Sequence, residues 1–178
     1  MPGDKIPLNE YASLEPQNIE QEKARELAFF VTDNFDVTPR LSVNMGLRYS
    51  VYSNLGPRSV YRYDPETSKS PETVTDTVFY GKDEIIKTYH NPEPRISFRF
   101  FLDDKSSLKI GYNHNVQYIQ LVSNTSAATP TDIWKLADTH IQPLKGNQFS
   151  LGYFRNFLDN TLETSVEVYY KSTENLID

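Results

Sequence analysis

The stretch RLSVNMGLRYSVY, residues 40–52, decides the fold of this chain. Every second residue from Leu41 to Val51 is apolar, and Ser, Asn, Gly and Arg stand between them. Successive side chains of a β-strand point to opposite faces of the sheet, so this alternation predicts a strand with one apolar and one polar face. Six apolar residues in a row at a period of two give a strong strand signal.

Five further segments repeat this pattern. Apolar and polar residues alternate in residues 27–37, 94–102, 107–122, 148–157 and 161–171. The start of the first segment is ambiguous, because the preceding IEQEKARELA is rich in helix formers and also fits a short helix. In the third segment His114 falls on the otherwise apolar face, which ends with Tyr118. We therefore expect an all-β, antiparallel fold of about six strands.

The connections between these strands are of two kinds. Residues 38–39, 103–106 and 158–160 are tight turns built from turn-forming residues, whereas residues 53–93 and 123–147 are long, polar and contain proline. Compact soluble domains rarely need two structureless loops of this length. Outer-membrane β-barrels alternate short periplasmic turns with long extracellular loops. Each strand also approaches or exceeds the roughly 9–11 residues that cross a membrane in a tilted barrel.

The composition fits a barrel wall and argues against other classes. Among 178 residues, 18 Lys and Arg against 24 Asp and Glu give a net charge of −6, which argues against a nucleic-acid partner. The absence of cysteine excludes disulfides and thiolate metal sites. Aromatic residues make up 13%, and several stand where interfacial girdles are expected. They are Phe35, Phe101 and Phe157 before the short turns, and Tyr49, Tyr52, Tyr118 and Tyr153 toward the long loops.

Six strands are too few to close a barrel of this kind. The smallest single-chain barrels have eight strands, and open sheet edges do not survive in lipid. We therefore expect residues 1–178 to be a partial barrel domain without its closing strands. A soluble β-sandwich would also show alternation, although its inner faces carry more aliphatic side chains and its loops are shorter.

Several segments together resemble the barrel of TonB-dependent outer-membrane receptors, in the version common in Bacteroidetes. The resemblance extends from about Glu10 to the end of the chain. It is carried by EKARELAFFVTDNFDVTPRLSVNMGLRYSVYSNLGP (22–57), NPEPRISFRF (91–100), YNHNVQYIQLVSNTSAATPTDIW (112–134), IQPLKGNQFSLGYFRNF (141–157) and ETSVEVYYKSTENLID (163–178).

The resemblance implies a large barrel of the Gram-negative cell outer membrane, occluded by an N-terminal plug that lies outside this chain. It implies active uptake of a siderophore, haem, cobalamin or a glycan, driven by a TonB complex that pulls on the plug. The implied partners are outer-membrane lipid, the plug, the TonB complex and, as an open possibility, a surface lipoprotein. The alternatives are a passive porin-like barrel and a soluble β-sandwich binding module at the cell surface.

No catalytic constellation stands out, and we expect neither an enzyme nor a cofactor. His90, His114 and His140 are isolated in the sequence, so no metal site is expected. Glu163 and Glu167 are four residues apart on one strand, at about 13 Å. This separation is too large for the paired carboxylates of a glycosidase.

Two groups of residues are candidates for binding. Five charged residues on the polar faces are expected to face the barrel lumen: Arg48, Arg95, Arg99, Glu163 and Glu167. The arginines either form a positive patch for a carboxylate or phosphate, or pair with these glutamates or with carboxylates of the plug.

The second group lies in the second long loop, where Asp132, Trp134 and His140 are candidate ligand-binding residues. An indole in an extracellular loop can stack on a sugar or a siderophore ring. The alternative is that Trp134 packs the loop on the barrel rim or anchors it at the membrane interface.

Overall fold

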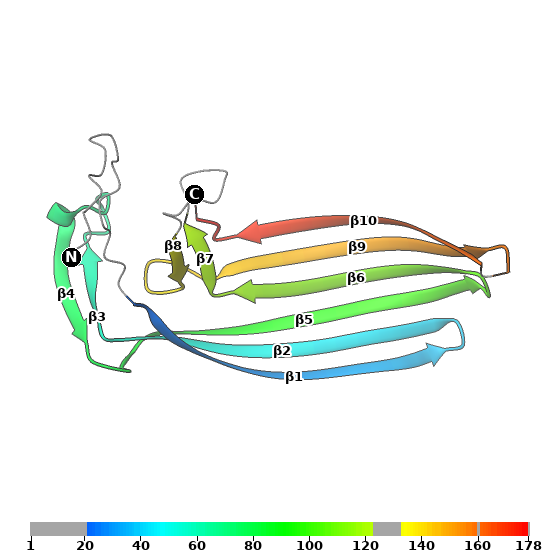
Figure 1. Ribbon diagram of the computed structural model, residues 1–178, viewed down its shortest axis with the longest axis horizontal. Coiled ribbons are helices and arrows are strands. Elements are labelled where there is room, and N and C mark those ends of the chain that lie inside the picture. The colour runs from blue at the N-terminus through cyan, green and yellow to red at the C-terminus, as the bar shows by residue number, and fades with distance from the viewer. Residues whose placement is uncertain (1–20, 123–132, 160, 178) are drawn as a thin grey trace, which may run out of the picture.

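The structure is a computed structural model that describes residues 21–122, 133–159 and 161–177. Its main feature is an antiparallel sheet of six long strands in the order β1-β2-β5-β6-β9-β10 (Figure 1). The strands are β1 (Lys23–Thr38), β2 (Leu41–Leu55), β5 (Ile85–Asp103), β6 (Ser106–Gln117), β9 (Leu144–Phe157) and β10 (Leu162–Glu174). The six expected strands are thus confirmed. Within the described part of the chain, no helix is long and apolar enough to cross a membrane.

Two short hairpins lie within the long connections. They are formed by β3 (Arg58–Tyr63) with β4 (Val74–Tyr80), and by β7 (Ile119–Val122) with β8 (Ile133–Leu136). The 3-10 helix η1 (Pro71–Thr73) precedes β4. Both hairpins lie at the end of the sheet opposite the tight turns (Figure 1). The two connections are long, as expected, and each also contains a short hairpin that the sequence pattern did not reveal.

The first strand begins earlier than the sequence alone could settle. Lys23 pairs with Leu55, and Leu27 pairs with Val51 in the same ladder. This pairing overrides the helix propensity of the segment, because long-range packing outweighs the small propensity differences between residues. The short-helix interpretation is wrong for the residues from Lys23 onward.

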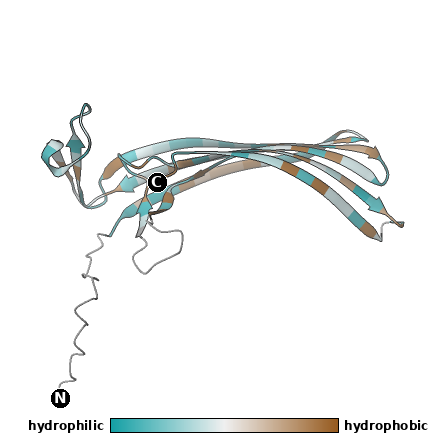
Figure 2. Cartoon of the chain, turned by 90° about the horizontal axis from the view of Figure 1, so that it is seen from above, coloured by the Kyte–Doolittle hydropathy of each residue, from teal (hydrophilic) through white to brown (hydrophobic). Residues whose placement is uncertain are grey.

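The pairing register gives the sheet one apolar face. Directly opposite residues of antiparallel strands share a face. One such row crosses all six strands through Phe35, Val43, Phe98, Ile110, Leu151 and Val168. Most of these side chains are exposed. Soluble monomers rarely expose apolar patches above a few hundred Å², and the sheet is a single curved layer (Figure 2).

The apolar face ends in polar contacts on the side of the hairpins. His114 Nδ1 lies 2.8 Å from Asn147 Oδ1, and this oxygen also accepts a hydrogen bond from the Tyr112 hydroxyl at 3.0 Å. On β2 the apolar residues run from Leu41 to Tyr49 and Val51 before the strand turns polar. His114 therefore lies at the edge of the apolar band rather than within it.

Pro92 and Pro94 determine where β5 separates from β6. Backbone N–H groups along an antiparallel strand point alternately to its two neighbours, so these two prolines remove donors on the same side. The ladder with β2 continues past both, whereas the ladder with β6 ends at the pair Arg95–Asn113. The missing donors therefore face β6, and the two strands separate toward the hairpin end.

Candidate functional site

A buried cluster on the polar face lies near the point where β5 and β6 separate. The rings of Tyr52 and Tyr118 stack with centroids 4.4 Å apart, and the two residues are 2% and 6% exposed. The Tyr118 hydroxyl lies 2.7 Å from Ser50 Oγ and accepts a hydrogen bond from Asn91 Nδ2 at 2.8 Å. Stacking and hydrogen bonds together fix the Tyr118 ring.

The expected girdle position of three tyrosines was wrong. Tyr118 lies between β6 and β7, where the alternation is interrupted, so its ring turns to the polar side and is buried. Tyr52 lies on the polar face because it is two residues after Ser50 on the same strand. Tyr153 pairs with Leu108 toward the tight turns, not toward the long loops.

Residues 137–143, here called the docked segment, are bound to the sheet by this cluster. The Tyr52 hydroxyl donates to the Ala137 carbonyl at 3.0 Å, and the Tyr89 hydroxyl donates to the Asp138 carbonyl at 2.6 Å. Ala137, Asp138 and Pro143 are almost completely buried. Burial raises the pKa of Tyr52 to about 12 and also raises the pKa of Tyr89.

Asp138 shapes the docked segment from within. Its Oδ1 accepts hydrogen bonds from the backbone N–H groups of His140 and Ile141, at 2.7 and 2.8 Å. Its Oδ2 lies 3.0 Å from Arg58 Nη1, on the strand β3 of the other hairpin. One carboxylate therefore both forms a turn in the second long connection and ties it to the first.

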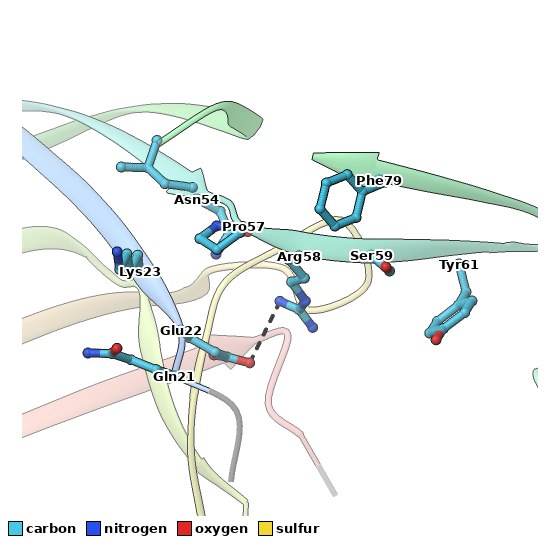
Figure 3. A pocket seen from close by; sticks show the side chains of 10 residues that line it. Gln21, Glu22, Lys23, Asn54, Pro57, Arg58, Ser59, Tyr61 and Phe79 are labelled. Carbon is cyan, nitrogen blue, oxygen red and sulfur yellow. Dashed lines mark ion pairs between the residues drawn. The ribbon is translucent and has the colours of Figure 1, made fainter. Parts of the chain in front are cut away.

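An ion-pair network joins three segments at this end of the sheet. Arg58 Nη1 lies 3.6 Å from Glu22 Oε1 (Figure 3). Lys135 Nζ lies 2.8 Å from the same oxygen. The other Glu22 oxygen accepts the backbone N–H of Leu136 at 2.9 Å. Since Arg58 also contacts Asp138, the entry to β1 and both long connections meet in one network with two positive and two negative groups.

A pocket of about 400 Å³ opens beside this network. Phe79 and Tyr61 contribute largely exposed rings to its wall, and Ser59 contributes a hydroxyl (Figure 3). Asn54 is buried in the same wall, and its Oδ1 has no hydrogen-bond partner within the described residues. Aromatic surface with a few polar groups is the usual make-up of a small-molecule pocket, and this volume is within the usual range.

Arg48 forms a different ion pair from those expected. Its guanidinium lies 2.6 Å from Glu26 Oε1 and 3.8 Å from Glu93 Oε1. Glu93 is only 1% exposed and also accepts hydrogen bonds from Ser50 Oγ at 3.0 Å and the Val116 N–H at 3.4 Å. Its carboxylate thus bridges β5 and β6 where the backbone ladder has ended.

The other two predicted arginines bind neutral partners. Arg95 donates to Asn115 Oδ1 at 3.0 Å, and Arg99 donates to Ser107 Oγ at 3.1 Å. The Arg99 guanidinium also lies over the Phe101 ring, 5.1 Å from its centroid. The expected common positive patch is therefore divided, because Arg48 is already neutralised by two carboxylates.

Glu163 and Glu167 share the polar face with these arginines. They lie on β10, and Glu167 pairs with Gly152 of β9. Within residues 21–122, 133–159 and 161–177, no ion pair joins either glutamate to the predicted arginines. Of the alternatives for Arg48, pairing with these two glutamates is not formed here, because Glu26 and Glu93 on the neighbouring strands are closer to it.

The three loop residues predicted to bind a ligand do not form one site within the described residues. Asp132 lies outside the described residues. Trp134 is 59% exposed on β8, opposite Leu121. His140 contacts the first long connection: its Nε2 lies 2.9 Å from the Tyr61 carbonyl, and its ring meets Tyr63 edge-on at 5.6 Å. His140 therefore joins the two loops.

No metal site is formed by the described His, Asp and Glu side chains. The arrangement instead combines an apolar outer face with a polar inner cluster. At the hairpin end of the sheet, the two hairpins and the docked segment form what is here called the rim, which carries a small pocket. A single-layer sheet with tight turns at one end and hairpins at the other defines a segment of an outer-membrane β-barrel.

The family model for the TonB dependent receptor-like β-barrel matches residues 3–178. The chain therefore belongs to the TonB-dependent receptor β-barrel family, whose members are outer-membrane receptors and transporters. Neither the curated proteins nor the solved structures yielded a match to this chain.

Proposed function

We propose that this chain forms six consecutive strands and part of the rim of a receptor for TonB-energised nutrient uptake. The two-faced sheet carries the proposal, because its apolar band is as tall as a membrane-crossing strand requires and its opposite face is polar. The family supports a receptor barrel in the outer membrane. A siderophore, haem, cobalamin or a glycan is the proposed cargo.

In this arrangement the tight turns face the periplasm and the hairpins face the exterior. The polar face borders the lumen, with Arg48, Arg95, Arg99, Glu163 and Glu167 directed toward the plug. The docked segment narrows the mouth of the barrel from this side. The plug and the TonB complex are the proposed partners for energy coupling, and a surface lipoprotein is a further proposed partner.

The rim is the proposed place of first contact with the cargo. Trp134, Tyr61 and Phe79 present exposed rings near polar groups, which suits a ligand with a flat or hydroxyl-rich surface. His140 holds the Tyr61 backbone and so acts as a positioning residue.

The test uses the complete receptor in the outer membrane of living cells. Accumulation of labelled ferrichrome, haemin, cyanocobalamin and maltoheptaose is followed with and without a protonophore. Energised uptake predicts that one probe accumulates above its external concentration and that the protonophore abolishes this. Equilibration that is insensitive to the protonophore would instead favour the passive porin-like barrel.

A rim variant then connects the uptake to this chain. Trp134→Ala should raise the concentration for half-maximal uptake of the accumulated probe on the order of tenfold, the loss expected for one stacking contact of 1–2 kcal/mol. Tyr169→Phe, far along β10 and exposed, is the matched control.

A further inference from the structure

Arg155 is a basic side chain on the apolar face, close to the tight turn after β9. It pairs with Ser106 of β6 and Thr164 of β10, and on its own strand it lies two residues from both Tyr153 and Phe157. These odd-numbered residues of β9 share the face of the exposed Leu151 and Phe149. The guanidinium therefore emerges among side chains that face hydrocarbon.

Aromatic groups hold this guanidinium in place. Its Nη1 donates a long hydrogen bond of 3.4 Å to the Tyr153 hydroxyl, and its centre lies 5.2 Å from the Phe157 ring centroid. No carboxylate within the described ranges forms an ion pair with it. Asp103, whose charge acts on Arg155 from longer range, is hydrogen-bonded to Ser106 Oγ at 2.7 Å.

Physical chemistry limits what such a group can bind. The free-energy cost of an arginine on the lipid face of a barrel is high at the bilayer midplane and small near the interface. Arg155 is near the end of its strand, and tyrosine beside it is typical of the headgroup level. An anion that occurs throughout this level is the phosphate of phospholipid headgroups, and a guanidinium binds phosphate through two parallel hydrogen bonds.

We propose that Arg155, Tyr153 and Phe157 form a binding site for the phosphate of a phospholipid headgroup, in the leaflet next to the tight turns. Since Tyr153 accepts its hydrogen bond from Arg155, the Tyr153 hydroxyl proton can be donated to another phosphate oxygen. Phe157 covers one side of the guanidinium and leaves its edge open. The site rests on the proposed function only in requiring a membrane-embedded barrel.

The test measures lipid retention by the complete receptor. The purified protein is stripped of lipid in detergent and titrated with phosphatidylglycerol or phosphatidylethanolamine, and bound lipids are counted by native mass spectrometry. Arg155→Gln should weaken one lipid-binding step on the order of tenfold, the loss expected for a charge-assisted pair of hydrogen bonds. Arg155→Lys and Tyr153→Phe should give smaller losses.

The matched control is Lys109→Gln, which removes one positive charge from the polar face, where Lys109 pairs with Gly152. Equal lipid binding by Arg155→Gln and the wild type would overturn the site, as would an equal loss in Lys109→Gln. Displacement of the lipid by millimolar inorganic phosphate would assign the site to free phosphate and overturn the lipid assignment. The heat-dependent shift in electrophoretic mobility shows that each variant is folded.

The uptake assay separates this proposal from the proposed function. Arg155→Gln should still accumulate the transported probe, because Arg155 faces away from the lumen. If Arg155→Gln binds lipid as the wild type does while the receptor accumulates the probe, only the lipid site is overturned. If Arg155→Gln loses the lipid while the wild-type receptor accumulates no probe, only the proposed function is overturned.

Discussion

Tyr52 and Tyr118 lie ring over ring, with centroids 4.4 Å and planes 5° apart. Tyr52 comes from the last part of β2, and Tyr118 from the junction of β6 and β7. The pair joins the wall of the sheet to the second long connection, since Tyr52 also holds the Ala137 carbonyl. The hairpin end of the sheet thus has a second, inner layer built by hydrogen bonds from tyrosine hydroxyls.

The Tyr118 hydroxyl should contribute measurably to the free energy that holds residues 137–143 on the sheet. Tyr118→Phe keeps the stack but leaves Asn91 Nδ2 and Ser50 Oγ without the partner they have at 2.8 and 2.7 Å. We expect opening of residues 137–143 to become easier by about 1–3 kcal/mol. Amide hydrogen exchange of the complete receptor measures this opening, and exchange in residues 137–143 should be faster in Tyr118→Phe than in the wild type. Tyr169→Phe, 72% exposed, should leave the exchange unchanged.

The pKa of Tyr52 predicts how docking depends on pH. Burial is the largest cause that raises this pKa from 10.0 to about 12, so the folded state favours the neutral phenol. Its contribution to stability is complete below pH 10, where neither state ionises, and is lost as the pH rises from 10 through 12. The phenolate absorbance of the wild type minus that of Tyr52→Phe should titrate near pH 12. A midpoint near 10 would contradict the burial.

Alternation in sequence predicted the six strands and the sharing of faces, because a period of two follows directly from strand geometry. The apolar face formed by every second residue from Leu41 to Val51 could be predicted without knowing which strands lie beside it. The same rule failed at Tyr118, since a break in the strand reverses the side on which later residues emerge. Only the register of the folded chain shows such a break.

The ion pairs of the rim could not be predicted from the sequence. Glu22, Arg58 and Asp138 carry no periodic signal and lie in three separate segments, which meet only because the topology brings both long connections to one end. For the buried carboxylate of Glu93, by contrast, the pattern Asn91-Pro92-Glu93-Pro94 was an available signal. Two prolines on one side of a strand mark a place where side chains must replace backbone hydrogen bonds.

The pair of Arg48 and Glu93 should show coupling in a double-mutant cycle. Arg48→Gln leaves a carboxylate that is 1% exposed without its positive neighbour, and we expect a loss of about 1–3 kcal/mol in the free energy of unfolding. In the Glu93→Gln background the same change should cost less, because no buried charge is left. Urea unfolding of the complete receptor in micelles measures both. Additive losses would show that Glu93 does not depend on Arg48.

The exposed pair of Arg62 and Asp76 provides the control for this cycle. Their closest atoms are 3.7 Å apart, and both side chains are more than half exposed. Exposed pairs contribute about 0–1 kcal/mol, so Arg62→Gln should change the unfolding free energy very little. A loss as large as that of Arg48→Gln would mean that burial is not what makes the Arg48 pair important.

Arg58 should hold the two long connections together. Its guanidinium contacts Asp138 Oδ2 at 3.0 Å and Glu22 Oε1 at 3.6 Å, and both carboxylates are largely buried. Arg58→Gln removes both contacts, so we expect the two connections to move more independently. Since this chain has no cysteine, spin labels can be placed at Ser68→Cys and Thr139→Cys, and pulsed electron resonance gives their distance distribution. The distribution should broaden in Arg58→Gln and keep its width in Arg62→Gln. Equal widths in all three proteins would show that the tyrosine contacts alone fix the rim.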